Sequence, residues 1–191
     1  QAEDGIRDSV ASRGLGRTNP NIQKLPDLAA QVVGMTSKFD ETAAQLIGIE
    51  RLIVTGRGFA YPTALEAALK IMETLYIDAH AFSTADLLHG PMAMLSDEVP
   101  VFAVAPDGRG FDAMKPALER ISVTTNKLFV FGGAAASGFG NHNLTIDHNL
   151  GEKLSPMLDI IALQNVIVRM AVNAGNDPDS PRGLKKVTET L

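Results

Sequence analysis

The chain of 191 residues contains no cysteine and no tryptophan, and aromatic residues make up only 5% of it. The absence of cysteine excludes disulfides, cysteine-ligated zinc or iron–sulfur centres, and a thiol nucleophile. The four histidines show no spacing typical of metal ligands. We therefore assign no metal site and expect no cofactor.

Positive charge and long apolar runs are also scarce. With 17 Lys+Arg against 22 Asp+Glu, the formal net charge is −5. This balance argues against a nucleic-acid surface, because phosphate binding needs a basic patch. No apolar run reaches the roughly 18 residues that span a bilayer, and no signal peptide opens the chain. We expect a cytoplasmic protein that binds neither nucleic acid nor membrane.

With 45% hydrophobic residues, the chain can bury the core of one domain. Along the chain, three segments differ in their sequence pattern. Residues 1–25 lack helical or strand periodicity, and we expect a flexible leader or the remnant of an upstream domain. The start at Gln1 rather than Met suggests a piece of a longer protein. Residues 26–175 form the expected domain with an N-terminal linker helix. Two prolines and a glycine predict that the tail at 176–191 is extended.

Strand and helix signals alternate after one or two amphipathic helices between Pro26 and Gly48. The expected strands lie near residues 51–55, 77–82, 100–105, 127–131 and 143–147. The expected helices lie near residues 62–76, 84–95, 111–125 and 156–174. Such alternation predicts an α/β fold with a parallel sheet covered by helices on both sides.

In such sheets, ligands bind outside the carboxyl ends of the strands. That rule places the site near residues 55–60, 83–89, 106–110 and 132–136. A glycine turn follows the first expected strand, where Gly56, Arg57 and Gly58 offer a backbone that a phosphate or sugar can approach. The turn lacks the third glycine of a dinucleotide fingerprint and the Gly-Lys-Ser/Thr of a P-loop. The need for a tight turn between strand and helix explains the two glycines equally well.

The next helix combines two carboxylates and an amine. Glu66, Lys70 and Glu73 are spaced i, i+4 and i+7, so they project within about 60° of one another. We expect an apolar, core-facing stripe beside them, formed by Leu65, Ala68, Leu69, Met72 and Tyr76. The arrangement is suited to proton transfer. The alternative is a surface helix with an ordinary Glu–Lys pair.

Two further motifs each have a structural and a functional interpretation. Ser83 and Asp86 fit a capping box, although Ser83 is also placed to touch a ligand. His89 precedes Gly90 and Pro91 in a turn, where an imidazole can move protons near neutral pH or serve only as a surface residue. In the tail, a lysine can form a Schiff base with a sugar carbonyl, the alternative being a disordered basic tail.

These motifs occur in the order and spacing of a known family. The run from Gly56-Arg57-Gly58 through Glu66, Lys70 and Glu73 to His89-Gly90-Pro91 resembles the sugar isomerase (SIS) domain. More narrowly, it is similar to the second of two SIS domains in the glucosamine-6-phosphate synthase family. The resemblance extends over residues 26–191, including the tail pattern Asp177…Pro181-Arg182…Leu184…Lys186-Val187-Thr188.

The resemblance implies a three-layer α/β/α sandwich with a five-stranded parallel sheet, and a sugar phosphate as ligand. It implies that Glu73 moves the proton between C1 and C2, with Glu66 and Lys70 as polar neighbours. His89 would assist ring opening from across a homodimer interface, and Lys186 would engage the open-chain sugar beside Lys185. Such an isomerisation needs one carboxylate base and a separate acid/base for the ring.

The chain also departs from that pattern. Met72 stands where the synthase has a second lysine, and the glutaminase half with its nucleophilic cysteine is absent. The first SIS domain, with its Ser/Thr-rich phosphate loop, is absent as well, so we expect an upstream SIS domain outside this sequence. We interpret the chain as part of an amino-sugar-phosphate isomerase or isomerising deaminase. The alternative is a non-catalytic domain that senses a phosphosugar.

Overall fold

The computed structural model describes residues 20–183, and its centre is a five-stranded sheet in which every neighbouring pair is parallel. The strand order is β2-β1-β3-β4-β5. The strands are β1 (Arg51–Gly56), β2 (Asp78–Ser83), β3 (Val101–Ala105), β4 (Leu128–Gly132) and β5 (His142–Thr145). The predicted strands are thus confirmed, each shifted by no more than two residues at either end.

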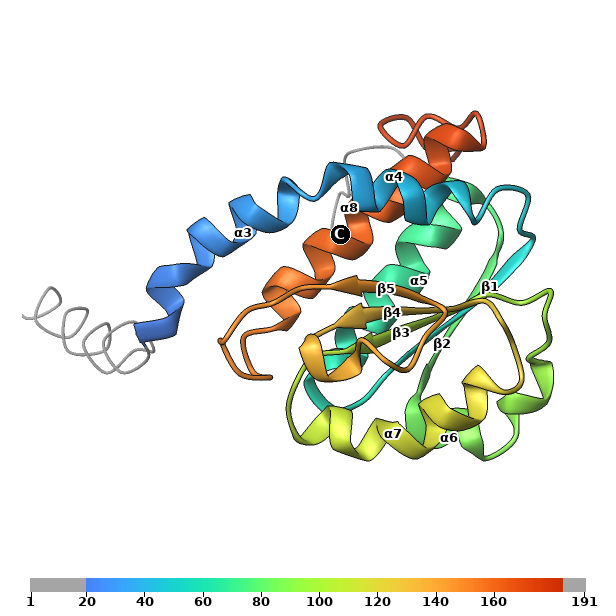
Figure 1. Cartoon of the computed structure of the whole chain (residues 1–191). Helices are drawn as coiled ribbons and strands as arrows, with labels where there is room; N and C mark the ends of the chain where they lie inside the picture. Colours follow the sequence, from blue (N-terminus) through green and yellow to red (C-terminus); the bar gives the residue numbers. More distant parts are fainter. Residues whose placement is uncertain (1–19, 184–191) are drawn as a thin grey trace, which may run out of the picture.

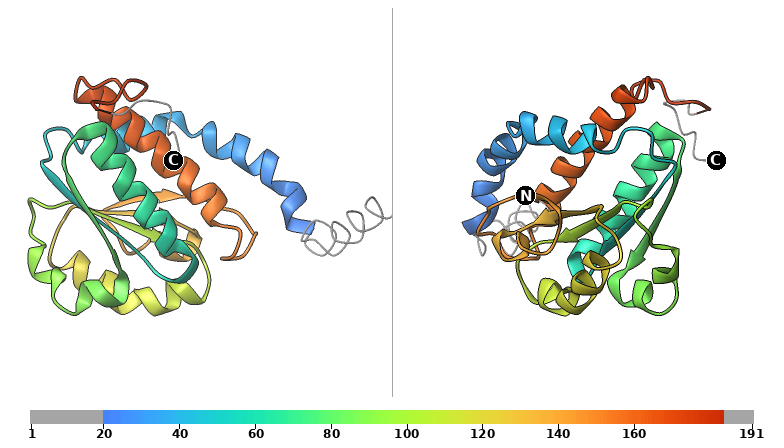
Figure 2. Two further views of the ribbon diagram at one scale, coloured as in Figure 1. Left: turned by 180° about the vertical axis from the view of Figure 1, so that it is seen from behind. Right: turned by 45° about the vertical axis from the view of Figure 1, so that its right-hand side comes forward.

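Helices cover both faces of the sheet, and Figures 1 and 2 show the resulting three layers. On one face lie α3 (Leu25–Val33), α4 (Thr36–Ala44), α5 (Tyr61–Leu75) and α8 (Pro156–Asn173). On the other lie α6 (Thr84–Leu88) and α7 (Arg109–Ser122). Short 3-10 helices occur at Pro20–Lys24, Gly58–Ala60, Pro91–Met94 and Ala134–Ala136. The predicted α/β/α sandwich is therefore confirmed.

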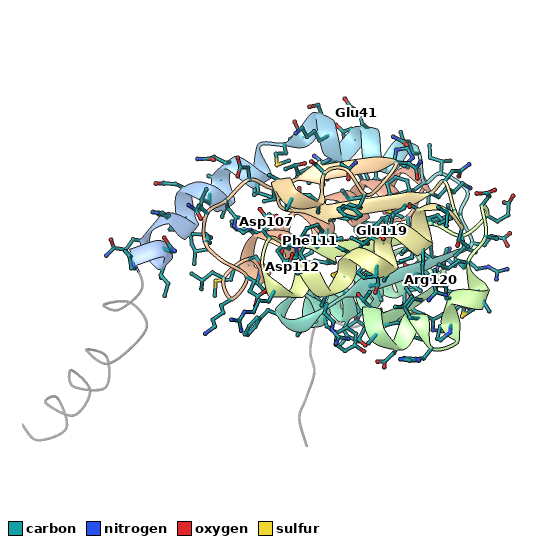
Figure 3. The ribbon with its side chains drawn as sticks, turned by 60° about the horizontal axis from the view of Figure 1, so that its bottom comes forward. Glu41, Asp107, Phe111, Asp112, Glu119 and Arg120 are labelled. Carbon is teal, nitrogen blue, oxygen red and sulfur yellow. The ribbon has the colours of Figure 1, made fainter. Side chains whose placement is uncertain are left out.

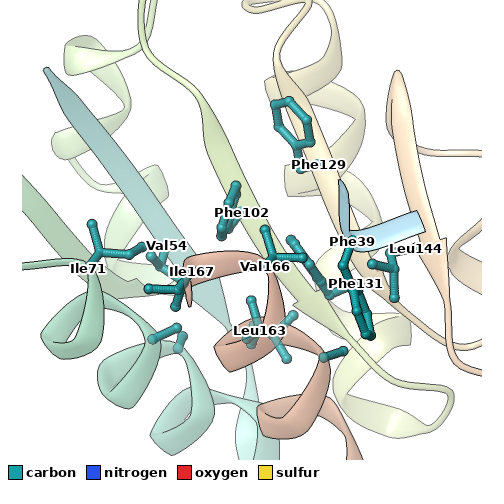
Figure 4. Close-up of a cluster of buried hydrophobic side chains, with 14 of the residues drawn as sticks. Phe39, Val54, Ile71, Phe102, Phe129, Phe131, Leu144, Leu163, Val166 and Ile167 are labelled. Carbon is teal, nitrogen blue, oxygen red and sulfur yellow. The ribbon is translucent and has the colours of Figure 1, made fainter. Parts of the chain in front are cut away.

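The larger of two buried cores lies between the sheet and the layer of α5 and α8 (Figure 4). The rings of Phe102 and Phe131 lie 4.8 Å apart at their centroids, where neighbouring strands bring them together. Leu163 and Val166 of α8 are fully buried in the same core. Both central strands β3 and β4 are buried along their whole length, as expected for strands covered on both faces.

Two predicted boundaries were wrong. Helical structure begins at Pro20 rather than Pro26, because a 3-10 turn runs directly into α3. The helix expected at 84–95 ends at Leu88, and a separate 3-10 turn begins at Pro91. Gly90 between them has φ 153°, which a continuous helix cannot accommodate. Across residues 20–183, no helix is long and apolar enough to cross a membrane.

Candidate functional site

The three charged residues expected on one helix face lie together on α5. The ammonium of Lys70 is 2.7 Å from Oε2 of Glu73 and 3.6 Å from Oε1 of Glu66. The exposed fraction of the side chain is 34% for Lys70, 28% for Glu73 and 40% for Glu66, so a ligand can reach all three. Chiefly through the hydrogen bond to Glu73, the pKa of Lys70 is raised above its usual value. The cluster therefore holds a permanent cation between two carboxylates.

The turn before α5 is explained by packing. A Cβ added to Gly56 would meet the carbonyl oxygen of Ala60 at 2.7 Å, which is shorter than any ordinary contact. Gly58 adopts a φ of +58°, in the left-handed region. Both glycines are thus needed to fold the chain from β1 into α5, and Arg57 lies half-buried between them. A role of this turn in ligand binding stays a prediction.

Of the apolar stripe expected beside the charges, Ala68 is buried as expected and Tyr76 is half-buried, but the three larger aliphatic side chains were wrongly expected to face the core. Leu65, Leu69 and Met72 remain 46%, 42% and 43% exposed. The residues that α5 buries are mostly small, and they are Thr63, Ala64, Ala67, Ala68, Ile71 and Leu75. Helical periodicity fits both stripes, but only the small side chains let α5 pack closely against β1, β2 and α8. Leu65, Leu69 and Met72 therefore face outward beside the charged cluster.

Beyond the carboxyl ends of β3 and β4, two of the four places where a ligand was expected, acidic side chains of the chain itself bind backbone N–H groups. Oε2 of Glu152 accepts a hydrogen bond of 2.9 Å from the backbone N–H of Gly110, in the first turn of α7. Oδ1 of Asp107 accepts one of 3.0 Å from the N–H of Ala135. Figure 3 shows Asp107 close to the start of α7. These carboxylates use N–H groups that would otherwise suit an anionic ligand.

A third acid beside this edge is fully buried. Asp159 lies in the first turn of α8 with no exposed surface, and neither of its carboxyl oxygens has a hydrogen-bond partner among the described residues. Burial raises the pKa of Asp159 to about 8, an effect that the nearby Ser155 only partly opposes. The carboxyl group is therefore protonated at neutral pH, which sequence reasoning had not revealed.

His89 does not join the charged cluster of α5. It follows α6, in the layer on the opposite side of the sheet, and its side chain is exposed. Ser83 does act as the N-cap of α6, since its Oγ accepts from the N–H of Asp86 at 3.2 Å and donates to the Asp86 carboxylate. Lys185 and Lys186 lie outside the described residues.

Sequence reasoning also missed a contact between the C-terminal segment and the end of α5. Arg182 packs over the ring of Tyr76, with its guanidinium carbon 4.5 Å from the ring centroid. Nothing in the local sequence pairs these residues, which are 106 positions apart. In residues 20–183, no cluster of three or more His, Cys, Asp and Glu side chains is placed to hold a metal ion.

The chain is similar in sequence to known aminotransferases from several organisms. The glutamine–fructose-6-phosphate aminotransferase [isomerizing] of Legionella pneumophila (strain Lens) is 35% identical over 166 residues, covering 86% of this chain and 28% of that protein. The enzyme of the same name from Thermococcus kodakarensis is 34% identical over 172 residues, covering 90% and 29%. The chain thus spans less than a third of the length of these relatives.

A solved structure shows the same architecture. The C-terminal domain of glucosamine-fructose-6-phosphate aminotransferase from Francisella tularensis superposes with a TM-score of 0.75 at 28% identity, covering 82% of this chain and 45% of that one. A glucosamine-6-phosphate deaminase from Thermotoga maritima, at 20% identity and a TM-score of 0.61, shares the fold; this match covers 95% of this chain and 52% of that one. The sequence profile of the SIS domain matches residues 45–174. The chain belongs to the SIS domain family.

Proposed function

We propose that this chain is the phosphosugar-binding SIS domain of an aldose–ketose isomerase or isomerising deaminase that acts on an amino-sugar phosphate. The observation that carries the proposal is the accessible Glu66–Lys70–Glu73 cluster of α5. Relatives whose names include fructose-6-phosphate support the substrate class. Isomerisation through an enediol requires one carboxylate that accepts a proton from one carbon and returns it to the next.

In this mechanism Glu73 is the base, and the sugar displaces its contact with Lys70. The freed ammonium then lies beside the reacting carbons, where it can stabilise the negative charge that develops on the enediol oxygen. Glu66, one turn earlier, continues to neutralise Lys70 between turnovers. The exposed fractions of the three side chains support this exchange, because none of them must leave a buried position to meet a sugar.

His89 and Lys186 complete the proposed site from elsewhere. His89 lies in the opposite helical layer from α5, so its participation requires a second copy of the chain, and we propose a homodimer. The outer faces of α5 and α8 offer apolar surface for an assembly partner: Leu65, Leu69, Met72, Met157, Val168 and Val172 are exposed. Sedimentation should show at least a dimer; a monomer at all accessible concentrations would contradict a shared site.

The sugar phosphate is proposed to bind mainly to an upstream SIS domain. At the strand ends of this chain, Asp107 and Glu152 already occupy backbone N–H groups, and their negative charge opposes a phosphate. The solved structures that match are about twice as long as the matched region, which leaves room for a second domain. With such a domain, Lys70, Arg57 and Lys185 would contact the sugar rather than carry its phosphate.

Proton exchange distinguishes the isomerase from the alternative, a domain that only senses a phosphosugar. In D2O, an enediol mechanism replaces hydrogen at C1 or C2 of fructose 6-phosphate or glucosamine 6-phosphate with deuterium, which proton NMR follows directly. Release of ammonia from glucosamine 6-phosphate would identify the deaminase. Saturable binding with neither deuterium exchange nor conversion of the sugar phosphate would favour the sensor and overturn the proposed enzyme. The sensor would need the pocket but not Glu73.

A further inference from the structure

Two buried hydroxyl groups join the carboxyl end of β1 to the segment that follows β2. Thr55, the last residue but one of β1, is fully buried, and Thr84, the first residue of α6, is 2% exposed. The two Oγ1 atoms lie 3.1 Å apart, and Oγ1 of Thr55 donates to the carbonyl oxygen of Phe82 at 3.1 Å. Each hydroxyl has one proton, so Thr84 is left to donate to Thr55.

The hydroxyl of Thr55 stands in apolar surroundings. The three residues before it in β1, Leu52, Ile53 and Val54, are all buried. Valine has nearly the shape of threonine and suits a strand equally well. A buried hydroxyl costs free energy unless it is hydrogen-bonded, whereas one whose bonds are satisfied restricts how the elements that it joins can be arranged. We infer that Thr55 serves to fix α6 against the sheet.

The helix α6 depends on such a contact. It has five residues, fewer than the roughly 12–15 that an isolated helix needs in water. Of these five, Thr84 and Leu87 are buried. Leu87 packs into the smaller of the two cores, where apolar contact is non-directional, while the hydrogen bond of Thr84 fixes a direction. The next residue, His89, donates its backbone N–H to the carbonyl oxygen of Asp86 at 3.0 Å, so α6 sets its position.

The same threonine stands where the path to the charged cluster begins. Thr55 directly precedes Gly56, from which the chain turns into α5 and on to Glu73. Figure 1 shows α5 and α6 on opposite sides of the sheet. In the proposed homodimer, each chain gives Glu73 to one site and His89 to the other. A twofold arrangement therefore requires that α5 and α6 of one chain keep a fixed relation to each other.

We propose that Thr55 and Thr84 are positioning residues that hold α6, and through it His89, in register with α5. The proposal rests on the proposed function, in which His89 acts on the sugar. Thr55→Val keeps the shape of the side chain and removes both hydrogen bonds. Because a displacement of about 1 Å can cost a factor of roughly 10² in rate, we expect kcat to fall by about tenfold with KM changed less than about twofold. Thr55→Ser, which keeps the hydroxyl, should recover most of it.

Amide hydrogen exchange followed by NMR tests the structural step without turnover. In Thr55→Val, the amides of α6 and His89 should exchange about tenfold faster, while those of α7 keep the protection of the parent and Thr55→Ser resembles the parent. Thr42→Val on α4 is the matched control, because its hydroxyl donates to the carbonyl oxygen of Lys38 in its own helix. Unchanged exchange in α6, or an equal acceleration in α7, would overturn the proposal.

A double-mutant cycle with His89→Gln tests the route in protein that turns over. If Thr55 acts through His89, adding Thr55→Val to His89→Gln should lower kcat no further. The same tenfold loss in both backgrounds would show a general structural effect and overturn the positioning role. Normal turnover in His89→Gln alone would instead overturn the role of His89 in the proposed function, and the exchange measurement would still decide whether Thr55 holds α6.

Discussion

The carboxylates of α5 and those beside the strand ends are stabilised in different ways. Glu66 and Glu73 share the ammonium of Lys70 on an accessible helix face. Glu152 accepts from a backbone N–H, while Asp159 is buried and its carboxyl oxygens have no hydrogen-bond partner within residues 20–183. An ion pair at an accessible surface can open to admit a ligand at little cost, whereas acids tied to backbone or core cannot. The comparison separates acids available for chemistry from acids that hold the fold.

Replacing the proposed base should have the largest effect. Glu73→Gln keeps the shape of the side chain and removes its basicity, so isomerisation by the active protein should fall by about 10²–10⁴ while sugar binding persists. Glu41→Gln, on the exposed surface of α4, is the control and should leave turnover unchanged. Near-normal turnover in Glu73→Gln would remove the distinction between the two groups of acids.

The buried Asp159 should make the free energy of unfolding depend on pH. Because burial raises the pKa of Asp159 to about 8 from an ordinary 3.8, the folded state keeps a proton that the unfolded state loses. The free energy of unfolding should therefore fall as pH rises between about 4 and 8, by about 1.4 kcal/mol per pH unit from this group. Asp159→Asn should remove that dependence.

Urea unfolding at pH 5, 6 and 7 measures the difference. The stability gained by Asp159→Asn over the parent should grow with pH, by about 3 kcal/mol from pH 5 to pH 7. Asp112→Asn, an exposed acid on α7, should show no such growth. Parallel curves for the parent and Asp159→Asn would mean that this carboxyl group is ionised in the folded state.

Because Asp107 and Glu152 already bind the N–H groups beyond β3 and β4, we predict that this chain alone binds phosphate weakly. We expect the 191 residues alone to bind glucosamine 6-phosphate or fructose 6-phosphate with a dissociation constant of about millimolar or weaker. This corresponds to a binding free energy of roughly 4 kcal/mol or less in magnitude. A longer protein with an upstream SIS domain should bind at least tenfold more tightly, about 1.4 kcal/mol. Calorimetric titration compares the two. Micromolar binding by the short chain would show that its own phosphate site is complete.

The smallest effect is expected at Glu152. Glu152→Gln weakens the contact with the N–H of Gly110, and the free energy of unfolding should fall by about 1 kcal/mol. Turnover of the active protein should stay within about twofold, because this acid supports a loop rather than the reaction. Glu119→Gln, exposed on α7, serves as the control. A loss of turnover comparable to that of Glu73→Gln would place the chemistry at the strand ends.

The regular alternation of strand and helix signals along the sequence made most of the fold predictable. Short β-rich runs such as 101–105 and 128–132 are typical of strands buried on both faces, and the helical periods between them indicate crossovers on both sides of the sheet. The charged cluster of α5 was predictable for the same reason, since residues four apart on a helix are always neighbours. Such features depend on local spacing, which a sequence displays directly.

Other features depend on which surfaces meet. Both stripes of α5 are apolar, and the sequence could not show that the small one faces the sheet until α8 and the strands were in place. The Tyr76–Arg182 contact and the Glu152–Gly110 hydrogen bond join residues 106 and 42 positions apart. No periodicity encodes such pairs.

The sequence by itself therefore determined the family, the parallel sheet and the residues of the α5 cluster, because each follows from local pattern and spacing. Only the tertiary structure decided that Glu152 and Asp107 occupy N–H groups beyond β3 and β4, that burial raises the pKa of Asp159, and that the segment after α8 contacts the end of α5 at Thr74 and Tyr76. Burial and long-range contact set the environment of each of these groups, and both arise only when distant segments pack together.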